Sequence, residues 1–350
     1  MSINRRNFLA SSAASLTFAG CSQKEAQWPG SPSSVTAAAP ATTIEVFDSG
    51  ITDLLDPQVT VEPVSSGYTW SEGPVWDRQR GCLYFNDVPR NTTWRWSERE
   101  GATEFLNPSG APMDETSGFR EPGANGLWIA RDGRLLICNH GKRAIERMDL
   151  DTGERSLLAS GYSEKRFNSP NDIVEGSDGA IFFTDPPYGL EGINESPLKE
   201  QDANGVYRLS PGGDVSRLLA DMTFPNGIGL SPDERTLYIA QSDPDMPILR
   251  ACAPDGSNVR MLFDFRPYMA EKAPGLPDGM AIAETGHIFQ TGPGGVFILT
   301  PEGHALGRIR TGKATANCCF GNADGRTLYM TAHDILMRLQ LRVRGLSWAA

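Results

Sequence analysis

Short apolar runs of about five residues alternate with turns rich in Gly, Asp, Asn and Pro along most of the chain. Runs of this length between such turns are typical of β-strands. No long segment carries the 3.6-residue period of an amphipathic helix. The pattern therefore predicts an all-β fold. After the N-terminus, no stretch is apolar for long enough to cross a bilayer as a helix.

One unit recurs along the chain: a short strand, a tight turn and a second strand. The six turns centre on Gly81, Gly133, Gly179, Glu234, Gly286 and Gly325, about 40 to 55 residues apart. A repeat of this length built from short strands is typical of propeller blades. In the second repeat the four strands are predicted at 125–130, 134–138, 144–149 and 154–159. We predict a six-bladed β-propeller with four-stranded blades.

The last blade supplies only three strands of its own, predicted at 317–321, 327–331 and 335–341. A strand from the N-terminal side of the domain is expected to complete it, either within 43–48 or within 59–63. Closing the ring in this way removes the two exposed edges that an open array would leave.

An oxygen-bearing side chain precedes each turn, by nine residues in the first copy and by eight in the others. These residues are Glu72, Asn125, Asn171, Asn226, Asp278 and Asn317. Because the first strand of every blade lines the central channel, we expect them to converge there. Any one of them alone is explained as a turn former, but six at one register favour a metal site. Oxygen ligands without Cys or His suit one divalent metal, Ca²⁺ best, with Zn²⁺ or Mn²⁺ as alternatives.

The N-terminus predicts export. Arg5 and Arg6 precede a short apolar run that ends at Cys21, which is typical of a twin-arginine signal followed by a lipoprotein cysteine. Ordinary cleavage nearby and a buried N-terminal helix are the alternatives. We divide the chain into a signal at 1–21, a flexible linker at 22–42 and a propeller domain at 43–350. The expected location is the periplasm or cell envelope, with membrane contact only through a lipid on Cys21.

Composition narrows the functional classes. The net charge is −11 without a basic stripe, which argues against nucleic acid as a partner. The other five cysteines match neither a zinc spacing nor a disulfide framework, so buried free thiols are expected. The sequence contains no Gly-x-Ser-x-Gly elbow, His-Glu-x-x-His motif or phosphate-binding loop. We expect a monomer or weak dimer.

Loops that follow the second strands should surround the mouth of the channel. His140 and Tyr188 fall in these loops and are predicted to bind substrate, although each also has a purely structural explanation. Two segments, 108–123 and 185–204, are unusually long and are candidates for lids, because long loops in a compact domain are commonly functional.

Several segments resemble one family. Ser-Glu-Gly-Pro-Val-Trp at 71–76, Asn-Ser-Pro-Asn-Asp at 168–172, Phe-Pro-Asn-Gly at 224–227 and Pro-Asp-Gly-Met at 277–280 are similar to motifs of the gluconolactonase family, which includes regucalcin (senescence marker protein). Thr-Asp-Pro-Pro-Tyr-Gly at 184–189 and Asn-His-Gly at 139–141 resemble its bacterial sugar-lactonase branch. The resemblance covers about residues 60 to 340.

The resemblance implies a metal held by Glu72, Asn171, Asn226 and Asp278, with Asp278 as acid/base and Asn125 as a polar pocket residue. The expected function is hydrolysis of a sugar lactone, with the metal as Lewis acid and Asp278 as general base. Two alternatives stay open. One is a metal-dependent arylesterase or organophosphate hydrolase on the same fold, and the other is a non-catalytic Ca²⁺-binding propeller lipoprotein.

Overall fold

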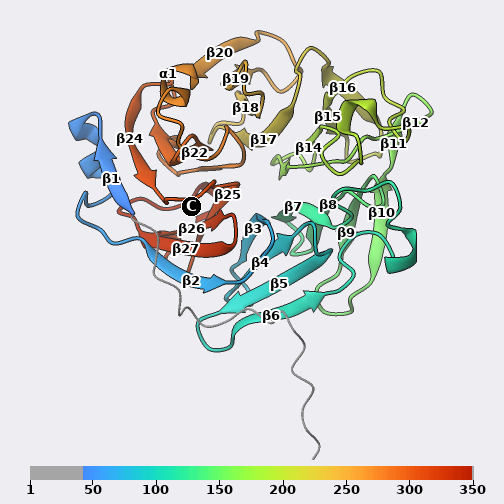
Figure 1. Cartoon of the computed structure of the whole chain (residues 1–350), viewed down its shortest axis with the longest axis horizontal. Coiled ribbons are helices and arrows are strands. Elements are labelled where there is room, and N and C mark those ends of the chain that lie inside the picture. The colour runs from blue at the N-terminus through green and yellow to red at the C-terminus, as the bar shows by residue number, and fades with distance from the viewer. Residues whose placement is uncertain (1–41, 349–350) are drawn as a thin grey trace, which may run out of the picture. The chain divides into compact units, whose positions relative to one another are not determined.

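Residues 42–348 are the part of the chain that the computed structural model describes. They form six antiparallel sheets arranged in a ring (Figure 1). The predicted export signal, Cys21 and nearly all of the predicted linker lie outside the described residues. None of the helices in the described range is long and apolar enough to cross a membrane.

The first three blades follow one another in sequence. The first contains β3 (Ser71–Asp77), β4 (Cys82–Asp87), β5 (Thr92–Ser97) and β6 (Gly101–Leu106). The second contains β7 (Ala124–Ile129), β8 (Leu135–Asn139), β9 (Ala144–Met148) and β10 (Arg155–Ala159). A small hairpin, β11 (Gly161–Tyr162) and β12 (Lys165–Arg166), precedes the third blade. The third contains β13 (Ile173–Glu175), β14 (Ile181–Asp185), β15 (Gly205–Leu209) and β16 (Val215–Leu219).

The remaining blades complete the ring. The fourth contains β17 (Pro225–Leu230), β18 (Leu237–Gln241), β19 (Ile248–Cys252) and β20 (Arg260–Asp264). The fifth contains β21 (Met280–Ile282), β22 (Ile288–Gly292), β23 (Gly295–Leu299), β24 (Ala305–Arg310) and, as a fifth strand, β1 (Thr43–Val46). The sixth contains β25 (Asn317–Gly321), β26 (Thr327–Ala332), β27 (Ile335–Gln340) and β2 (Glu62–Ser66).

The helical elements are short; all but the last along the chain connect strands. They are the 3₁₀ turns η1 (Ser49–Asp53), η2 (Met113–Glu115), η3 (Ile193–Glu195) and η4 (Leu346–Trp348), and the α-helix α1 (Arg266–Met269). The six-bladed all-β architecture predicted from the turn repeat is confirmed, and the predicted strands of the second and sixth blades lie within two residues of the observed ones.

The first strand of each blade lies on the inside of the ring. Each of these strands contacts the first strands of both neighbouring blades, and β25 contacts β3 to complete the circle. Residues at the start of the six inner strands therefore approach one another around the central channel. This arrangement of the inner strands is the reason why residues at equivalent positions of the six repeats come close together.

The sixth blade takes its outer strand from the N-terminal side of the domain. β2 pairs antiparallel with β27, with Glu62 opposite Arg338 (Figure 1, blue beside red). The other candidate segment, which begins at Thr43, instead forms β1 and pairs with β24 in the fifth blade. The ring is thus held together by strand pairing between the two ends of the propeller domain.

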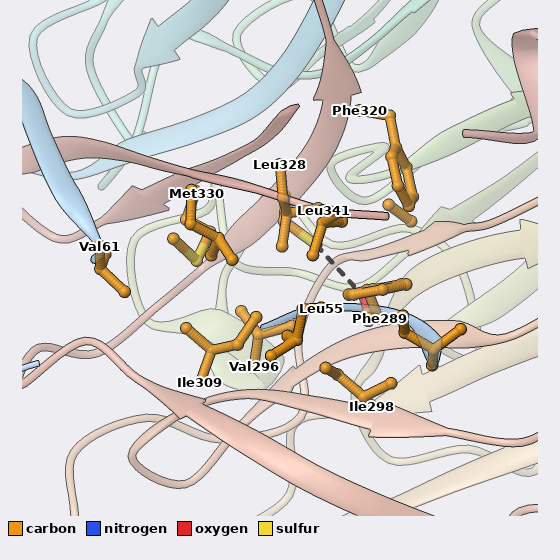
Figure 2. Packing of buried hydrophobic residues seen from close by; sticks show 14 of the residues in the cluster. Leu55, Val61, Phe289, Val296, Ile298, Ile309, Phe320, Leu328, Met330 and Leu341 are labelled. Atoms are coloured by element: carbon orange, nitrogen blue, oxygen red, sulfur yellow. Dashed lines mark hydrogen bonds between the residues drawn. The ribbon is translucent and has the colours of Figure 1, made fainter. Parts of the chain in front are cut away.

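Buried apolar side chains fill the spaces between neighbouring blades. Between the fifth and sixth blades, Leu55 and Val61 from the segment joining β1 to β2 pack with Phe289, Val296 and Met330 (Figure 2). Five cysteines are described and all are free; Cys82, Cys138, Cys252 and Cys318 are buried and Cys319 is partly exposed.

Candidate active site

The six oxygen-bearing residues singled out by the repeat lie where the inner strands begin. Glu72, Asn125, Asn226 and Asn317 occupy the first or second positions of their strands, whereas Asn171 and Asp278 precede β13 and β21 by two residues. Five of the six are no more than 6 % exposed. Asp278 is partly exposed, but its Oδ1 atom is buried.

Glycines explain how these residues come so close together. A Cβ on Gly73, Gly126 or Gly227 would lie less than 3.0 Å from the backbone carbonyl of the site residue in the next blade. Real Cβ atoms do not make such contacts, so only glycine fits where two inner strands meet. The Gly that follows Glu72, Asn125, Asn226 and Asp278 in the sequence is therefore part of the site's construction.

Four polar side chains form a hydrogen-bonded chain across the second to fourth blades. Asn125 Nδ2 donates to Asn171 Oδ1 at 2.8 Å, and Asn171 Nδ2 donates to Asn226 Oδ1 at 2.5 Å. Asn226 Nδ2 donates to Ser242 Oγ at 2.8 Å, and Ser242 donates to the backbone carbonyl of Pro277. A carbonyl can only accept, so the direction of the whole chain is fixed and the amide oxygens keep one lone pair free.

Carboxyl groups gather on the other side of these amides. Burial, and to a smaller extent the charges of Asp172 and Glu121, raise the pKa of Glu72 to about 8. The pKa of Asp278 lies well above its ordinary value because of burial and then the charge of Glu72. Burial is the larger cause of both pKa shifts, and repulsion between the like charges in the channel adds to it.

The residues present fit a divalent cation. Asp278 Oδ1 is buried and has no hydrogen-bond partner among residues 42–348, an arrangement that needs an explanation in a folded protein. A cation beside it would offset the repulsion from Glu72. In the described part of the chain, no three His, Cys, Asp or Glu side chains gather as a metal site, so any such site here relies on the amide oxygens.

Two long loops cover the mouth and are joined to each other. The segment 107–123 leads into β7, and the segment 186–204 connects β14 to β15. The backbone N–H groups of Arg120 and Glu121 both donate to the carbonyl of Gly189, and Glu191 N–H donates to Gly118. The two segments predicted as lids thus form one cover.

His140 follows β8 and lies under this cover. Its side chain is fully buried, with Nε2 3.4 Å from Asn125 Nδ2 and with Nδ1 3.9 Å from Glu121 Oε2. A Cβ on Gly189 would lie 2.8 Å from the His140 side chain, so the cover packs tightly on the imidazole. Burial lowers the pKa of His140 to about 4, which keeps the ring neutral near pH 7.

Tyr188 comes from the same cover and faces Asp278. Its ring stacks on Phe224 with the centroids 5.5 Å apart, and its hydroxyl donates to the Ser242 carbonyl at 3.4 Å. Burial and then the charge of Asp278 raise the pKa of Tyr188. The structure therefore brings the predicted substrate-binding residues Asn125, His140 and Tyr188 to the predicted metal ligands.

Residues 70–334 match the family model described as SMP-30/Gluconolactonase/LRE-like region. A gluconolactonase of Zymomonas mobilis is 40% identical over 310 residues, which cover 86% of this chain and 87% of that protein. The chain belongs to this family.

Other comparisons place this SMP-30/gluconolactonase family member among lactonases. A pentonolactonase of Haloferax volcanii is 28% identical and is covered over 80% of its length by 74% of this chain. The solved structure of a gluconolactonase from Xanthomonas campestris superimposes with a TM-score of 0.73 at 30% identity, covering 87% of this chain and 99% of that one.

Spacing alone did not identify every polar group of this family member's site. Asp172 stands where four of the other blades have glycine, and its carboxylate accepts the backbone N–H groups of Ile173 at 3.0 Å and Ile228 at 3.1 Å. Glu121 and Ser242 reach the site from loops. Of these three residues, only Asp172 could have been found from the sequence, because it directly follows Asn171, which stands at the repeated position.

On the far side of these residues, the channel of this family member widens into a cavity. Its volume is about 690 Å³, and Asp172 and Asn317 line its inner end. Apolar side chains such as Leu127, Ile228 and Phe320 share its walls with polar ones such as Arg131, Glu175 and Glu234. The buried oxygen residues thus separate this cavity from the covered mouth.

Proposed function

We propose that this protein hydrolyses a sugar lactone, the activity after which its relatives from Zymomonas mobilis and Xanthomonas campestris are named. One observation supports this proposal above all. Asp278 carries a buried oxygen that has no hydrogen-bond partner among residues 42–348, and the charges of Glu72, Asp172 and Glu121 act on it. A purely structural aspartate would have its hydrogen bonds satisfied, whereas a general base must keep a free lone pair for a proton.

We infer that Glu72, Asn171, Asn226 and Asp278 would hold one divalent cation. Two carboxylates and two amides offer only oxygen, which suits a hard ion and favours Ca²⁺. When bound, the cation would polarise the lactone carbonyl and orient the ring. The chain of hydrogen bonds from Asn125 to Ser242 fixes the two amide oxygens before any ligand arrives.

Side chains of this protein would carry out the proton transfers and hold the substrate. Asp278 would accept a proton from water as the water oxygen attacks the lactone carbonyl carbon. The bond between that carbon and the ring oxygen then breaks, and the ring oxygen takes up the proton from Asp278 to give a hydroxy acid. The joined loops would restrict the entry of bulk water, and Tyr188 would pack beside the reacting ring.

The test is hydrolysis of glucono-1,5-lactone and other aldonolactones by residues 42–350. Activity is measured as purified, after EDTA, and after addition of Ca²⁺, Zn²⁺ or Mn²⁺. Loss with EDTA and recovery with one ion would support metal dependence. Turnover of aryl esters but no lactone would favour the esterase alternative, and tight metal binding without any turnover would favour a binding protein.

Asp278→Asn tests the general base directly. The amide keeps an oxygen for the cation but cannot take a proton, so kcat should fall by about 10²- to 10⁴-fold while metal still binds. Asp245→Asn, an exposed aspartate in the β18–β19 loop, is the matched control and should stay active. A variant Asp278→Asn with wild-type kcat would exclude this role.

We also propose that the protein is exported and anchored by lipid at Cys21, which the paired Arg5 and Arg6 and the small residues before Cys21 support. Replacing both arginines by lysine should leave the precursor in the cytoplasm. Cys21→Ser should remove fatty-acid labelling and release the protein from the membrane fraction. Unchanged fractionation of both variants would reject the proposal.

A further inference from the structure

The orientation of His140 follows from the hydrogen-bonded chain in the site. Asn125 Nδ2 is a donor, because the chain that ends at the Pro277 carbonyl has only one possible direction. His140 Nε2 faces this donor at 3.4 Å, and we assign it as the acceptor of the contact. A neutral imidazole has one N–H, so the proton of His140 lies on Nδ1.

That N–H group has no partner. His140 Nδ1 is fully buried and makes no hydrogen bond within residues 42–348. The carboxylate oxygen Glu121 Oε2 lies 3.9 Å from it, which is too far for a hydrogen bond. An unsatisfied buried donor is costly, so this side of the imidazole is suited to receive an oxygen atom.

Glu121 presents the complementary group. Arg120 donates to Oε1 through Nε at 3.1 Å and Nη2 at 2.6 Å, which fixes the carboxylate. Among the described residues Oε2 accepts no hydrogen bond. The Glu121 side chain is only 11 % exposed, and its charge acts on both Glu72 and Asp278. The loop 107–123 therefore places a free carboxylate oxygen beside the candidate metal site.

We propose that Glu121 and His140 together bind one hydroxyl group of the substrate. The hydroxyl donates to Glu121 Oε2 and accepts from His140 Nδ1–H. A carbonyl or ether oxygen cannot donate to a carboxylate, and an ammonium group cannot accept from the imidazole. The pair therefore selects a hydroxylated lactone over an unsubstituted lactone or an aryl ester. This inference rests on the proposed lactonase function and narrows its substrate class.

Two substrates that differ only in hydroxyl groups test the pair. Glucono-1,5-lactone and δ-valerolactone share the six-membered lactone ring, and only the first carries hydroxyls. Glu121→Ala and Glu121→Gln should lower kcat/KM for glucono-1,5-lactone by about 10- to 100-fold, the usual effect of losing a hydrogen bond to a charged group. Hydrolysis of δ-valerolactone should change by a clearly smaller factor, because only the effect of the Glu121 charge on Asp278 acts there. Glu115→Ala, an exposed carboxylate of the same loop, is the control.

A binding measurement separates this inference from the proposed function. 1,5-Anhydro-D-glucitol has the hydroxylated ring but no carbonyl, so calorimetry reports recognition without turnover. Binding that Glu121→Ala weakens at least 10-fold supports the pair even if no lactone is hydrolysed. The inference would be overturned if Glu121→Ala lowered kcat/KM equally for both lactones or for neither. It would also be overturned if the wild type neither bound the polyol nor preferred the hydroxylated lactone.

Discussion

Glu72 is expected to affect stability in opposite directions with and without metal. It is 3 % exposed, and burial raises its pKa from the ordinary 4.5 to about 8. In the unfolded chain it ionises near its ordinary pKa. Protonated Glu72 therefore contributes its whole share of the free energy of unfolding below about pH 4. This contribution is lost as the pH rises towards 8 and the buried carboxyl group ionises. Glu72→Gln should thus raise Tm of the EDTA-treated protein at pH 8 by several degrees and change it little at pH 4.

Added Ca²⁺ should reverse this effect. The wild type should gain Tm on addition of Ca²⁺ at pH 8, because an ion that binds only the folded state stabilises it. Glu72→Gln should gain less, since one charged ligand is gone. Scanning calorimetry of both proteins, with exposed Glu115→Gln as control, measures both effects. Identical pH profiles for wild type and Glu72→Gln would contradict the crowding of carboxylates described here.

Residues fixed by the repeat could be predicted, and residues supplied by loops could not. Glu72, Asn171 and Asn226 follow from nearly equal spacing before each turn, because the blades impose one register. Glu121 belongs to an insertion present in a single blade, so no period marks it. The full burial of His140 depends on where segment 186–204 folds back, a tertiary contact that spacing does not encode.

At the level of elements, the inner strands depend on glycine for their mutual approach. A Cβ on Gly227 would overlap the backbone carbonyl of Asp278. Gly227→Ala should therefore push β17 away from the loop before β21, weaken Ca²⁺ binding at least 10-fold and destabilise the fold. Gly212→Ala is the matched control, because its Cβ would meet nothing closer than 3.6 Å, and it should be neutral or slightly stabilising.

Calorimetric titration with Ca²⁺ and urea unfolding check this prediction together. Wild-type metal affinity in Gly227→Ala would show that the strands can separate without disturbing the ligands. The glycine itself was visible in the sequence, next to Asn226. The sequence did not show why glycine is needed there, because Asn-Gly also forms ordinary turns. Only the position of the neighbouring blade shows that close approach of its backbone requires glycine.

Strand positions were more predictable than strand partners. The edges of β25, β26 and β27 follow from apolar runs between turns, and the observed strands agree within a residue. The partner of the segment at Thr43 did not follow, since both the fifth and sixth blades offered an outer edge. Pairing of β1 with β24 is accompanied by ion pairs from Glu45 to Arg308 and Arg310, which sequence patterning does not reveal.

For the whole domain, the ring depends on packing between the first and last parts of the described chain. The segment between β1 and β2 buries Ile51, Leu54, Leu55 and Val61 against the fifth and sixth blades (Figure 2). A six-fold repeat predicts the ring but not this packing, because the segment lies outside the repeat. The apolar residues of the segment between β1 and β2 belong to no blade, and they complete the core between the fifth and sixth blades.

Leu55→Ala tests how much this segment contributes to closure. Leu55 is 0 % exposed, so the variant should lose about 2–5 kcal/mol of unfolding free energy through lost burial and a residual cavity. Leu55 packs in the apolar core between the fifth and sixth blades and not against Glu72 or Asp278, so kcat of the folded fraction should not change. Leu157→Ala, with the same atoms removed from a side chain that is 61 % exposed, should change stability by less than about 0.5 kcal/mol. Urea unfolding compares the two, and equal stabilities would mean that the ring closes through strand pairing between β2 and β27 without help from this core.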